Sequence, residues 1–220
     1  MSFHSSIEKL ASTLSKKSRS EKYSQFLTLL APKPEETILD AGVNTTEYSE
    51  ADNYLEKNYS YPEKITALGQ GEMGEFQKRY PNVRALSGDG RALSFPNNAF
   101  HIAYSNAVIE HVGNRDDQKR FLRELYRVSS RGYLTTPNRF FPIEVHTRVP
   151  LLHILLSKAH FDVFLKYIKK DWATGNYMTL FSEQELRTLL NDAGIEDYTF
   201  IKNRFLGFPM TFTVIWKKPS

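Results

Sequence analysis

Short apolar runs alternate with amphipathic segments through the central part of the chain. The runs predicted to be strands cover residues 37–40, 65–68, 83–87, 100–104 and 132–135. Several are apolar throughout rather than at every second position, which is typical of strands buried on both faces of a parallel sheet. Residues 73–79 and 116–128 have helical periodicity. This alternation predicts a doubly wound α/β sheet that binds ligands beyond the carboxyl ends of its strands.

The N-terminal segment is predicted to be helical. Apolar residues recur at helical spacing over residues 5–18, and a second short helix is predicted over residues 22–30. Pro32 and Pro34 end this second helix, because proline cannot continue a helix and disfavours the α conformation of the residue before it.

The C-terminal part is predicted to contain a helix and two further strands. Ser182 and Glu185 form a capping box, which predicts that a helix begins there and ends near Gly194. Two β-rich runs follow, at residues 198–202 and 211–216, and an antiparallel pair at the sheet edge is the natural arrangement. The predicted fold is therefore α/β, with a Rossmann-like, doubly wound, mostly parallel sheet and a C-terminal antiparallel strand pair.

Length and composition favour one globular domain. The 220 residues suffice for one sizeable α/β domain and are short for two, so we expect a single domain over residues 1–220. The chain has no cysteine, which excludes disulfides, thiolate metal sites and cysteine nucleophiles. The first residues lack a basic region followed by an apolar run, and no apolar run approaches the roughly 18 residues of a membrane span. We therefore expect a cytoplasmic protein.

The charge balance is slightly basic. Lys and Arg number 29 against 25 Asp and Glu, a formal net charge of +4. Part of this charge gathers at residues 16–19, 166–170 and 217–218. A nucleic-acid enzyme often has such a balance, but solvated helix ends are the interpretation we favour.

The turn after the first predicted strand has some features of a nucleotide-binding turn. Such a turn needs an acidic residue followed by glycines that let the backbone approach the ligand, and Asp40 and Gly42 fit this pattern. A plain turn after a strand has the same residues. The second strand ends in Gly69 and Gln70, where an acidic residue usually holds a ribose hydroxyl; Gln70 can make that hydrogen bond without the charge.

The strongest signal is the block from residue 87 to residue 112. It reads Ser87-Gly88-Asp89-Gly90-Arg91-Ala92-Leu93-Ser94-Phe95-Pro96, then Phe100-His101-Ile102-Ala103-Tyr104-Ser105-Asn106, then Ile109-Glu110-His111. This order closely resembles the class I S-adenosylmethionine-dependent methyltransferases, in particular the type 11 group. Members typically read Gly-Asp, Leu-Pro-Phe or similar, Phe-Asp in a strand, and then Leu-Glu-His. The resemblance covers roughly residues 36–140 in element order, and His101 stands where the family usually has Asp.

The resemblance implies that the cofactor is S-adenosylmethionine. Asp89 would accept a hydrogen bond from the adenine amino group, and the Gly90 backbone would flank the ring. Asp40 and the backbone around Gly42 would approach the methionine moiety, and the end of the fourth strand would line the sulfonium site. The predicted cofactor-binding residues are Asp40, Gly42, Gly69, Gln70, Asp89, Gly90, Ser105 and Asn106.

The segment after the fifth strand is predicted to hold the methyl acceptor. Methyl transfer is an in-line displacement, so positioning supplies much of the rate and a base is needed only where the acceptor keeps its proton. Asn138, Glu144 and His146 are predicted to line the acceptor pocket, with His146 or His111 as the base. An equal alternative is that Glu144 and His146 pair structurally and hold the loop. The histidines do not cluster at metal spacing, so no metal is expected.

The residues after the fourth strand indicate the class of acceptor. Nucleic-acid amino-methylating enzymes usually carry a Pro-Pro-aromatic motif there, and this chain has Ser105-Asn106-Ala107-Val108. This favours a small-molecule, sugar or lipid-linked acceptor over RNA. The apolar helix predicted over residues 149–168, within an expected substrate-side insertion over residues 139–180, could cap the acceptor pocket or rest on a membrane surface, although a core role is more common. A non-catalytic binding module that keeps the fold stays open as an alternative, and the sequence does not indicate the oligomeric state.

Overall fold

The computed structural model describes residues 3–143, 147, 149, 151–175 and 178–219. The chain divides into two compact units. The first unit comprises Met1–Asp89 and Phe100–Ile102, and the second comprises Gly90–Ala99 and Ala103–Ser220. The single domain expected over residues 1–220 stays a prediction.

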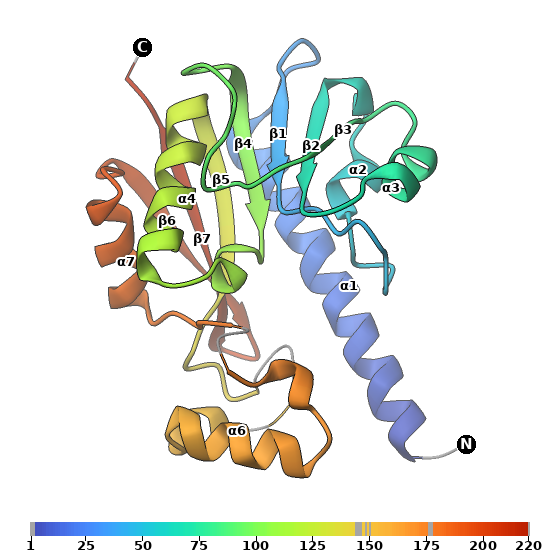
Figure 1. Ribbon diagram of the computed structural model, residues 1–220, viewed down its shortest axis with the longest axis vertical. Helices are drawn as coiled ribbons and strands as arrows, with labels where there is room; N and C mark the ends of the chain where they lie inside the picture. The colour runs from blue at the N-terminus through green and yellow to red at the C-terminus, as the bar shows by residue number, and fades with distance from the viewer. Residues whose placement is uncertain (1–2, 144–146, 148, 150, 176–177, 220) are drawn as a thin grey trace. The chain divides into compact units, whose positions relative to one another are not determined.

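Seven strands form one sheet in the order β3-β2-β1-β4-β5-β7-β6 (Figure 1). Their bounds are Ile38–Ala41 (β1), Ile65–Gly69 (β2), Arg84–Ser87 (β3), Phe100–Asn106 (β4), Ser129–Pro137 (β5), Tyr198–Phe205 (β6) and Phe208–Lys217 (β7). Strands β1, β2 and β3 pair in parallel, whereas β7 pairs antiparallel with both β5 and β6. The predicted Rossmann-like, mostly parallel sheet with a C-terminal antiparallel pair is confirmed.

The helices of the first unit are α1 (Phe3–Leu30), α2 (Tyr54–Asn58), the 3-10 turn η1 (Pro62–Lys64) and α3 (Gly74–Arg79). The predicted pair of N-terminal helices is wrong in one respect, because α1 is a single helix of 28 residues. The segment between the two predicted helices, Ser18 to Glu21, contains no glycine or proline to break it. Helix α1 ends before Pro32, as expected, with Phe26 and Leu30 buried.

The second unit contains η2 (Ile109–His111), α4 (Arg115–Val128), α5 (Leu152–Leu155), α6 (Lys158–Tyr167), η3 (Asp171–Ala173) and α7 (Glu183–Asp192). The capping box predicted at Ser182 and Glu185 is present. The apolar stretch predicted as one helix over residues 149–168 is instead divided, because Ser157 caps the start of α6 with its side chain. Of the helices in the described ranges, none is long and apolar enough to cross a bilayer.

The core of the second unit lies between its helices and the antiparallel strands. Helices α4 and α7 bury leucines such as Leu122 and Leu189, and β7 buries Trp216. A Cβ at Gly132 of β5 would lie 1.9 Å from the Trp216 ring, so only glycine leaves room for the indole. Strands β6 and β7 are joined by Leu206 and Gly207, both at positive φ, which gives a tight hairpin.

Candidate functional site

In the first unit, the carboxyl ends of three parallel strands meet at one edge. The Gly42 amide, after β1, donates a hydrogen bond to the Leu68 carbonyl at 2.8 Å. The Gly88 amide, after β3, donates to the carbonyl of Gly69 at 3.0 Å. The predicted residues Gly42, Gly69 and Asp89 are therefore brought to the same edge, which is where ligands bind in open α/β sheets.

Glycine is required at this edge because the turns pack closely. A Cβ at Gly69 would lie 2.8 Å from Met73 Sδ and 3.2 Å from the Val43 carbonyl oxygen. A Cβ at Gly88 would lie 2.9 Å from Leu68 Cδ1. Gly42 has a φ of 105°, a conformation that favours glycine.

The groups at this edge fit a nucleoside cofactor. The Gly42 backbone and the Gln70 side chain are exposed, and Asp89 is half-buried directly after β3. A carboxylate can accept a hydrogen bond from an exocyclic amine, and a side-chain amide can bond a ribose hydroxyl. The chemistry of these residues is compatible with the adenosine part of S-adenosylmethionine, and the predicted contacts of Asp89 and Gln70 with it stay predictions.

Asp40 differs from the other predicted cofactor residues because it is buried, with 7% of its surface exposed. Burial raises its pKa well above the usual range, and the nearby carboxyl of Glu56, itself 5% exposed, raises the pKa further, while Arg19 acts in the opposite direction. Burial also raises the pKa of Glu56, to about 6. The Asp40 side chain thus faces a second carboxyl group, and its predicted contact with the methionine moiety stays a prediction.

The long connection between β1 and β2 is organised by Glu47, a residue that sequence reasoning did not single out. Its carboxylate accepts hydrogen bonds from the Tyr80 hydroxyl and from Asn53 Nδ2 at 3.0 Å. Its other oxygen lies 3.0 Å from Lys57 Nζ and 3.3 Å from Arg79 Nη1. Although burial alone raises a carboxyl pKa, the hydrogen bonds from Tyr80, Lys57 and Asn53 lower the pKa of Glu47. This segment is therefore a fixed part of the first unit.

In the second unit, the predicted residues at the end of β4 are held by neighbouring strands. Ser105 is 1% exposed. Asn106 donates from Nδ2 to the Tyr104 hydroxyl at 3.2 Å and accepts at Oδ1 from Thr135 Oγ1 at 2.5 Å. The strand end is therefore fixed, and its side chains are oriented by β4 and β5 rather than left mobile.

Gly90, at the start of the second unit, lies against α4. A Cβ there would meet Phe121 at 2.6 Å from Cε2 and 2.8 Å from Cδ2. The last glycine of the Gly-Asp-Gly sequence is therefore required by its close packing against Phe121. The predicted role of the Gly90 backbone beside the adenine ring stays a prediction.

Glu110 and His111 lie in the 3-10 turn η2, which is separate from α4, and α4 begins at Arg115. Glu110 is 1% exposed, and its Oε2 accepts a hydrogen bond from Thr136 Oγ1 at 2.9 Å. Its carbonyl oxygen accepts from the Thr179 amide at 2.7 Å. Glu110 therefore joins the end of β5 to the segment before α7. His111, one of the two predicted bases, is half-buried next to it.

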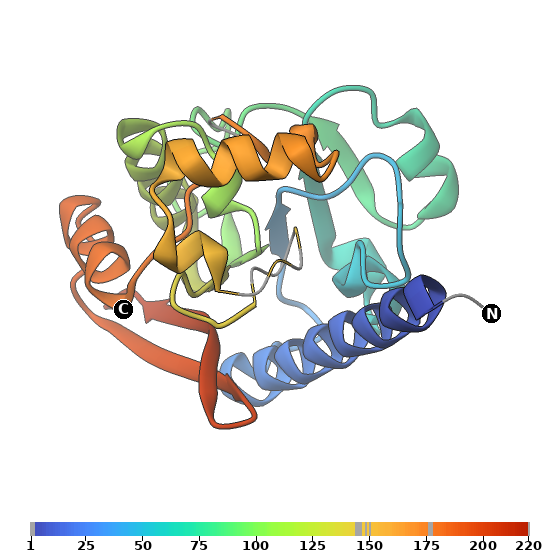
Figure 2. The same ribbon diagram turned by 90° about the horizontal axis from the view of Figure 1, so that it is seen from below.

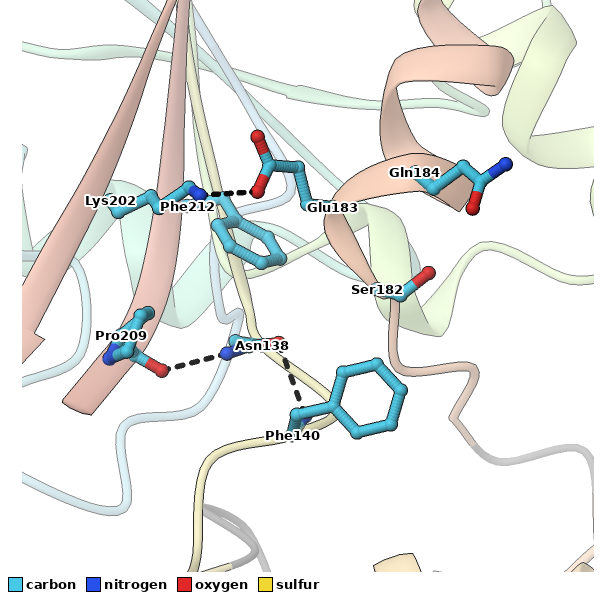
Figure 3. A pocket seen from close by; sticks show the side chains of 8 residues that line it. All are labelled: Asn138, Phe140, Ser182, Glu183, Gln184, Lys202, Pro209 and Phe212. Carbon is cyan, nitrogen blue, oxygen red and sulfur yellow. Dashed lines mark hydrogen bonds and ion pairs between the residues drawn. The ribbon is translucent and has the colours of Figure 1, made fainter.

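A hollow of about 360 Å³ lies at the carboxyl end of β5 in the second unit (Figure 3). It is lined by Asn138, Phe140, Ser182, Glu183, Gln184, Lys202, Pro209 and Phe212. Lys202 Nζ lies 2.5 Å from Glu183 Oε2, and this contact, with that of Arg187, lowers the pKa of Glu183. The hollow thus combines two aromatic rings with an ion pair.

Asn138 lines this hollow, but its side chain is occupied by backbone partners. Nδ2 donates to the Pro209 carbonyl at 2.8 Å, and Oδ1 accepts from the Phe140 amide at 3.1 Å (Figure 3). Its predicted contact with the acceptor stays a prediction beside this structural role. Glu144 and His146, the other two predicted acceptor residues, lie outside the described residues.

His101 has a structural role at the start of β4. Its Nδ1 accepts a hydrogen bond from the Thr37 amide at 3.1 Å, so it supports the start of β1 rather than a ligand. Across the part of the chain that the structure describes, no group of His, Asp and Glu side chains could hold a metal ion.

Comparisons with known proteins agree with this arrangement. Residues 47–135 match a family model for a methyltransferase domain, that of the type 11 group. No curated protein matches the chain. An S-adenosylmethionine-dependent methyltransferase from Methanosarcina mazei is 19% identical, with 85% of this chain and 94% of that chain covered and a TM-score of 0.55. One from Aquifex aeolicus is 18% identical, with 96% of each chain covered and a TM-score of 0.57.

A structure with ligands is also similar. The Burkholderia thailandensis 1,6-didemethyltoxoflavin-N1-methyltransferase, solved with 1,6-didemethyltoxoflavin and S-adenosylhomocysteine bound, is 14% identical, with 100% of this chain and 92% of that chain covered and a TM-score of 0.57. At these identities the likeness shows a shared fold. Together with the match of residues 47–135 to the methyltransferase-domain model, it indicates an S-adenosylmethionine-dependent methyltransferase.

Proposed function

We propose that the chain transfers the methyl group of S-adenosylmethionine to a small-molecule, sugar or lipid-linked acceptor. The observation that carries this proposal is the hollow at the end of β5, whose volume of about 360 Å³ is that of a small-molecule site. Its exposed Phe140 offers an apolar surface, and the ion pair of Glu183 with Lys202 offers polar contacts.

The end of β4 supports the same choice. Enzymes that methylate base amines stack the flipped base on an aromatic side chain after this strand. Here Asn106 and Ala107 follow Ser105, Asn106 is held by Tyr104 and Thr135, and Ala107 has a φ of 60°. None of the side chains of Ser105, Asn106 and Ala107 is aromatic, so the segment offers no stacking surface for a base.

The chemistry needs little from the protein beyond placement. S-adenosylmethionine, when bound, supplies an electrophilic methyl group on its sulfonium. Asp89 and Gln70 bind and orient the adenosine part of the cofactor, and this positioning supplies much of the rate. His111 removes a proton where the acceptor is still protonated.

Cofactor binding is tested by titration calorimetry with S-adenosylmethionine. The Asp89→Ala variant should bind about tenfold or more weakly, because it loses a charged hydrogen-bond acceptor for the adenine amine. Asp197→Ala is the matched control, since Asp197 is exposed in the turn before β6 and should leave the affinity unchanged. A folded parent protein that does not bind millimolar cofactor would support the alternative of a non-catalytic binding module.

The acceptor class is tested with S-adenosylmethionine that carries a radiolabelled methyl group. The enzyme is incubated separately with a small-metabolite fraction, a lipid extract and total RNA, and label should enter one of the first two. Phe140→Ala should raise KM for the acceptor, whereas Phe208→Ala, exposed to 58% against 57% for Phe140 and outside the lining, should not. Label found in RNA alone would overturn the proposal.

A further inference from the structure

Helix α6 carries large apolar side chains on two opposite faces. Its inner face buries Phe161 and Leu165, which pack with Val149 and Ala173. Its outer face exposes Val163 to 67%. An amphipathic helix that packs on a core normally keeps the opposite face polar.

The outer face is apolar over more than one turn. Val163 and Tyr167 are four residues apart and therefore lie on the same side of the helix, and Tyr167 is 85% exposed. Leu155 of the preceding helix α5 is 72% exposed. Exposed apolar groups gathered in this way mark a surface that binds something.

The charges beside these residues are positive. Lys166 and Lys169 are exposed, and neither forms an ion pair with another residue among those described. The acidic residue of α6, Asp162, is paired with Lys158. From residue 158 to residue 171 the chain has four Lys and two Asp, a local charge of +2.

We propose that the outer face, defined as Val163, Lys166, Tyr167 and Lys169, binds the surface of an anionic lipid bilayer. Such a surface offers lipid phosphates to the lysines and an apolar layer to the valine, and tyrosine is enriched at this depth. Each lysine near an anionic leaflet strengthens binding, and the effect is screened by salt. An uncharged apolar partner would leave the two lysines without a counterpart.

The position of the helix gives the binding a direction. Within the second unit, α6 lies beyond the carboxyl end of β5 (Figure 1), and it lies across the near side when the molecule is seen from below (Figure 2). Phe161 and Leu165 pack in the apolar cluster that α6 forms with Val149 and Ala173, on the side of the helix opposite to Val163. A bilayer on the outer face would therefore lie on the same side as the end of β5.

The proposal is tested by co-sedimentation of the full chain with vesicles. One set contains phosphatidylcholine alone, and the other contains phosphatidylcholine mixed with phosphatidylglycerol. The chain should sediment with the anionic vesicles and not with the neutral ones, and added salt should release it. The double variant Lys166→Glu with Lys169→Glu should bind about tenfold or more weakly, since two attractions become repulsions.

Matched variants separate the outer face from general surface effects. Tyr167→Ser should weaken vesicle binding, whereas Tyr48→Ser in the first unit, exposed to 86%, should not. Lys33→Glu is the control for charge, and circular dichroism shows that each variant is folded. Equal binding by the parent and the Lys166 and Lys169 double variant, or no binding to anionic vesicles, would overturn the proposal. The readout is binding rather than turnover, so its outcome does not depend on the acceptor.

Discussion

Asp40 of β1 and Glu56 of α2 are two buried carboxyl groups that face each other, with 7% and 5% of their surfaces exposed. Two adjacent carboxylates in a medium of low dielectric cannot both ionise readily, so the pair retains a proton near neutral pH. Neither side-chain oxygen of Glu56 has an N–H or O–H partner among the described residues, and a proton on the pair removes the repulsion between the two carboxylates. Asp40 lies two positions before Gly42, so this pair supports the turn at the cofactor edge.

The buried pair gives the protein a specific pH dependence. Burial raises the pKa of Glu56 to about 6 from an ordinary value of 4.5, so the folded state binds the proton more tightly than the unfolded state. The contribution to the free energy of unfolding is therefore complete below pH 4.5 and is lost as the pH rises through 6. The loss from Glu56 is about 2 kcal/mol, because one pKa unit corresponds to about 1.4 kcal/mol.

The Glu56→Gln variant isolates this effect. Glutamine keeps the neutral, hydrogen-bonding form at every pH. In urea unfolding at a series of pH values, the free energy of unfolding of the variant should therefore rise relative to that of the parent between about pH 4.5 and about pH 7. Glu35→Gln, at an exposed position, is the control and should follow the parent. A constant difference between Glu56→Gln and the parent across this range would show that the carboxyl pair does not titrate as described.

Gly90→Ala should destabilise the second unit. The added Cβ would meet the Phe121 ring at 2.6 Å, and moving a packed aromatic ring costs about 1–3 kcal/mol. Thermal unfolding measures the cost. In a double-mutant cycle, Phe121→Leu should relieve part of it, since the smaller side chain leaves room for the methyl group.

Gly74→Ala is the control for this substitution. A Cβ there meets nothing within 4 Å, and the residue begins α3, so alanine should be neutral or stabilising by up to about 1 kcal/mol. If Gly90→Ala were as stable as the parent, the close packing against Phe121 would not be what requires the glycine.

Much of the fold was predictable because its strands are marked by apolar runs and its turns by proline, glycine and capping residues. The failures occurred where the signal is not local. The apolar periodicity that predicted the two helices does not extend over Ser18 to Glu21, yet α1 runs through this segment without a break. In the apolar stretch 149–168, Ser157 caps the start of α6, so the predicted single helix is divided there. This capping role is recognised only once the start of α6 is known.

The candidate site was predicted in part. The strand-end residues Gly42, Gly69 and Asp89 were found because parallel strands place their ends together. Glu47 and Glu56 were missed, because each is recognised only by partners distant in the sequence or on another element. Glu110 was read as part of a motif, whereas its contact with Thr136 became evident only from the structure.

Asn138→Ala should lower the stability of the protein, in addition to any change in its affinity for the acceptor. The substitution removes the side-chain partner of the partly buried Pro209 carbonyl and of the Phe140 amide, at a cost of about 1 kcal/mol. Gln184→Ala removes an exposed amide from the same hollow and should change stability by less than about 0.5 kcal/mol. An Asn138→Ala protein with unchanged thermal stability and a raised KM would mean that the residue serves the acceptor alone.

Glu47→Gln should destabilise the first unit, with a pH dependence opposite to that of the Asp40–Glu56 pair. The pKa of Glu47 is lowered, so its stabilising effect is present above the ordinary pKa and is lost as the pH falls. Loss of the charged contacts to Tyr80 and Lys57 should cost about 2 kcal/mol at neutral pH and less in acid.

A double-mutant cycle with Tyr80→Phe shows how much of the stability lost in Glu47→Gln comes from the contact between Glu47 and Tyr80. Burial, and then the hydrogen bond to Glu47, raise the pKa of Tyr80, so the hydroxyl remains a donor throughout the range used. Because Glu47 and Tyr80 are in direct contact, the two substitutions together should cost about 1 kcal/mol less than the sum of their separate costs. Lys78→Met, which removes only an exposed ion pair with Glu75, is the control for a surface charge near α3 and should change stability little. Strict additivity of Glu47→Gln and Tyr80→Phe would show instead that Glu47 stabilises the connection through its lysine and arginine partners, without the tyrosine.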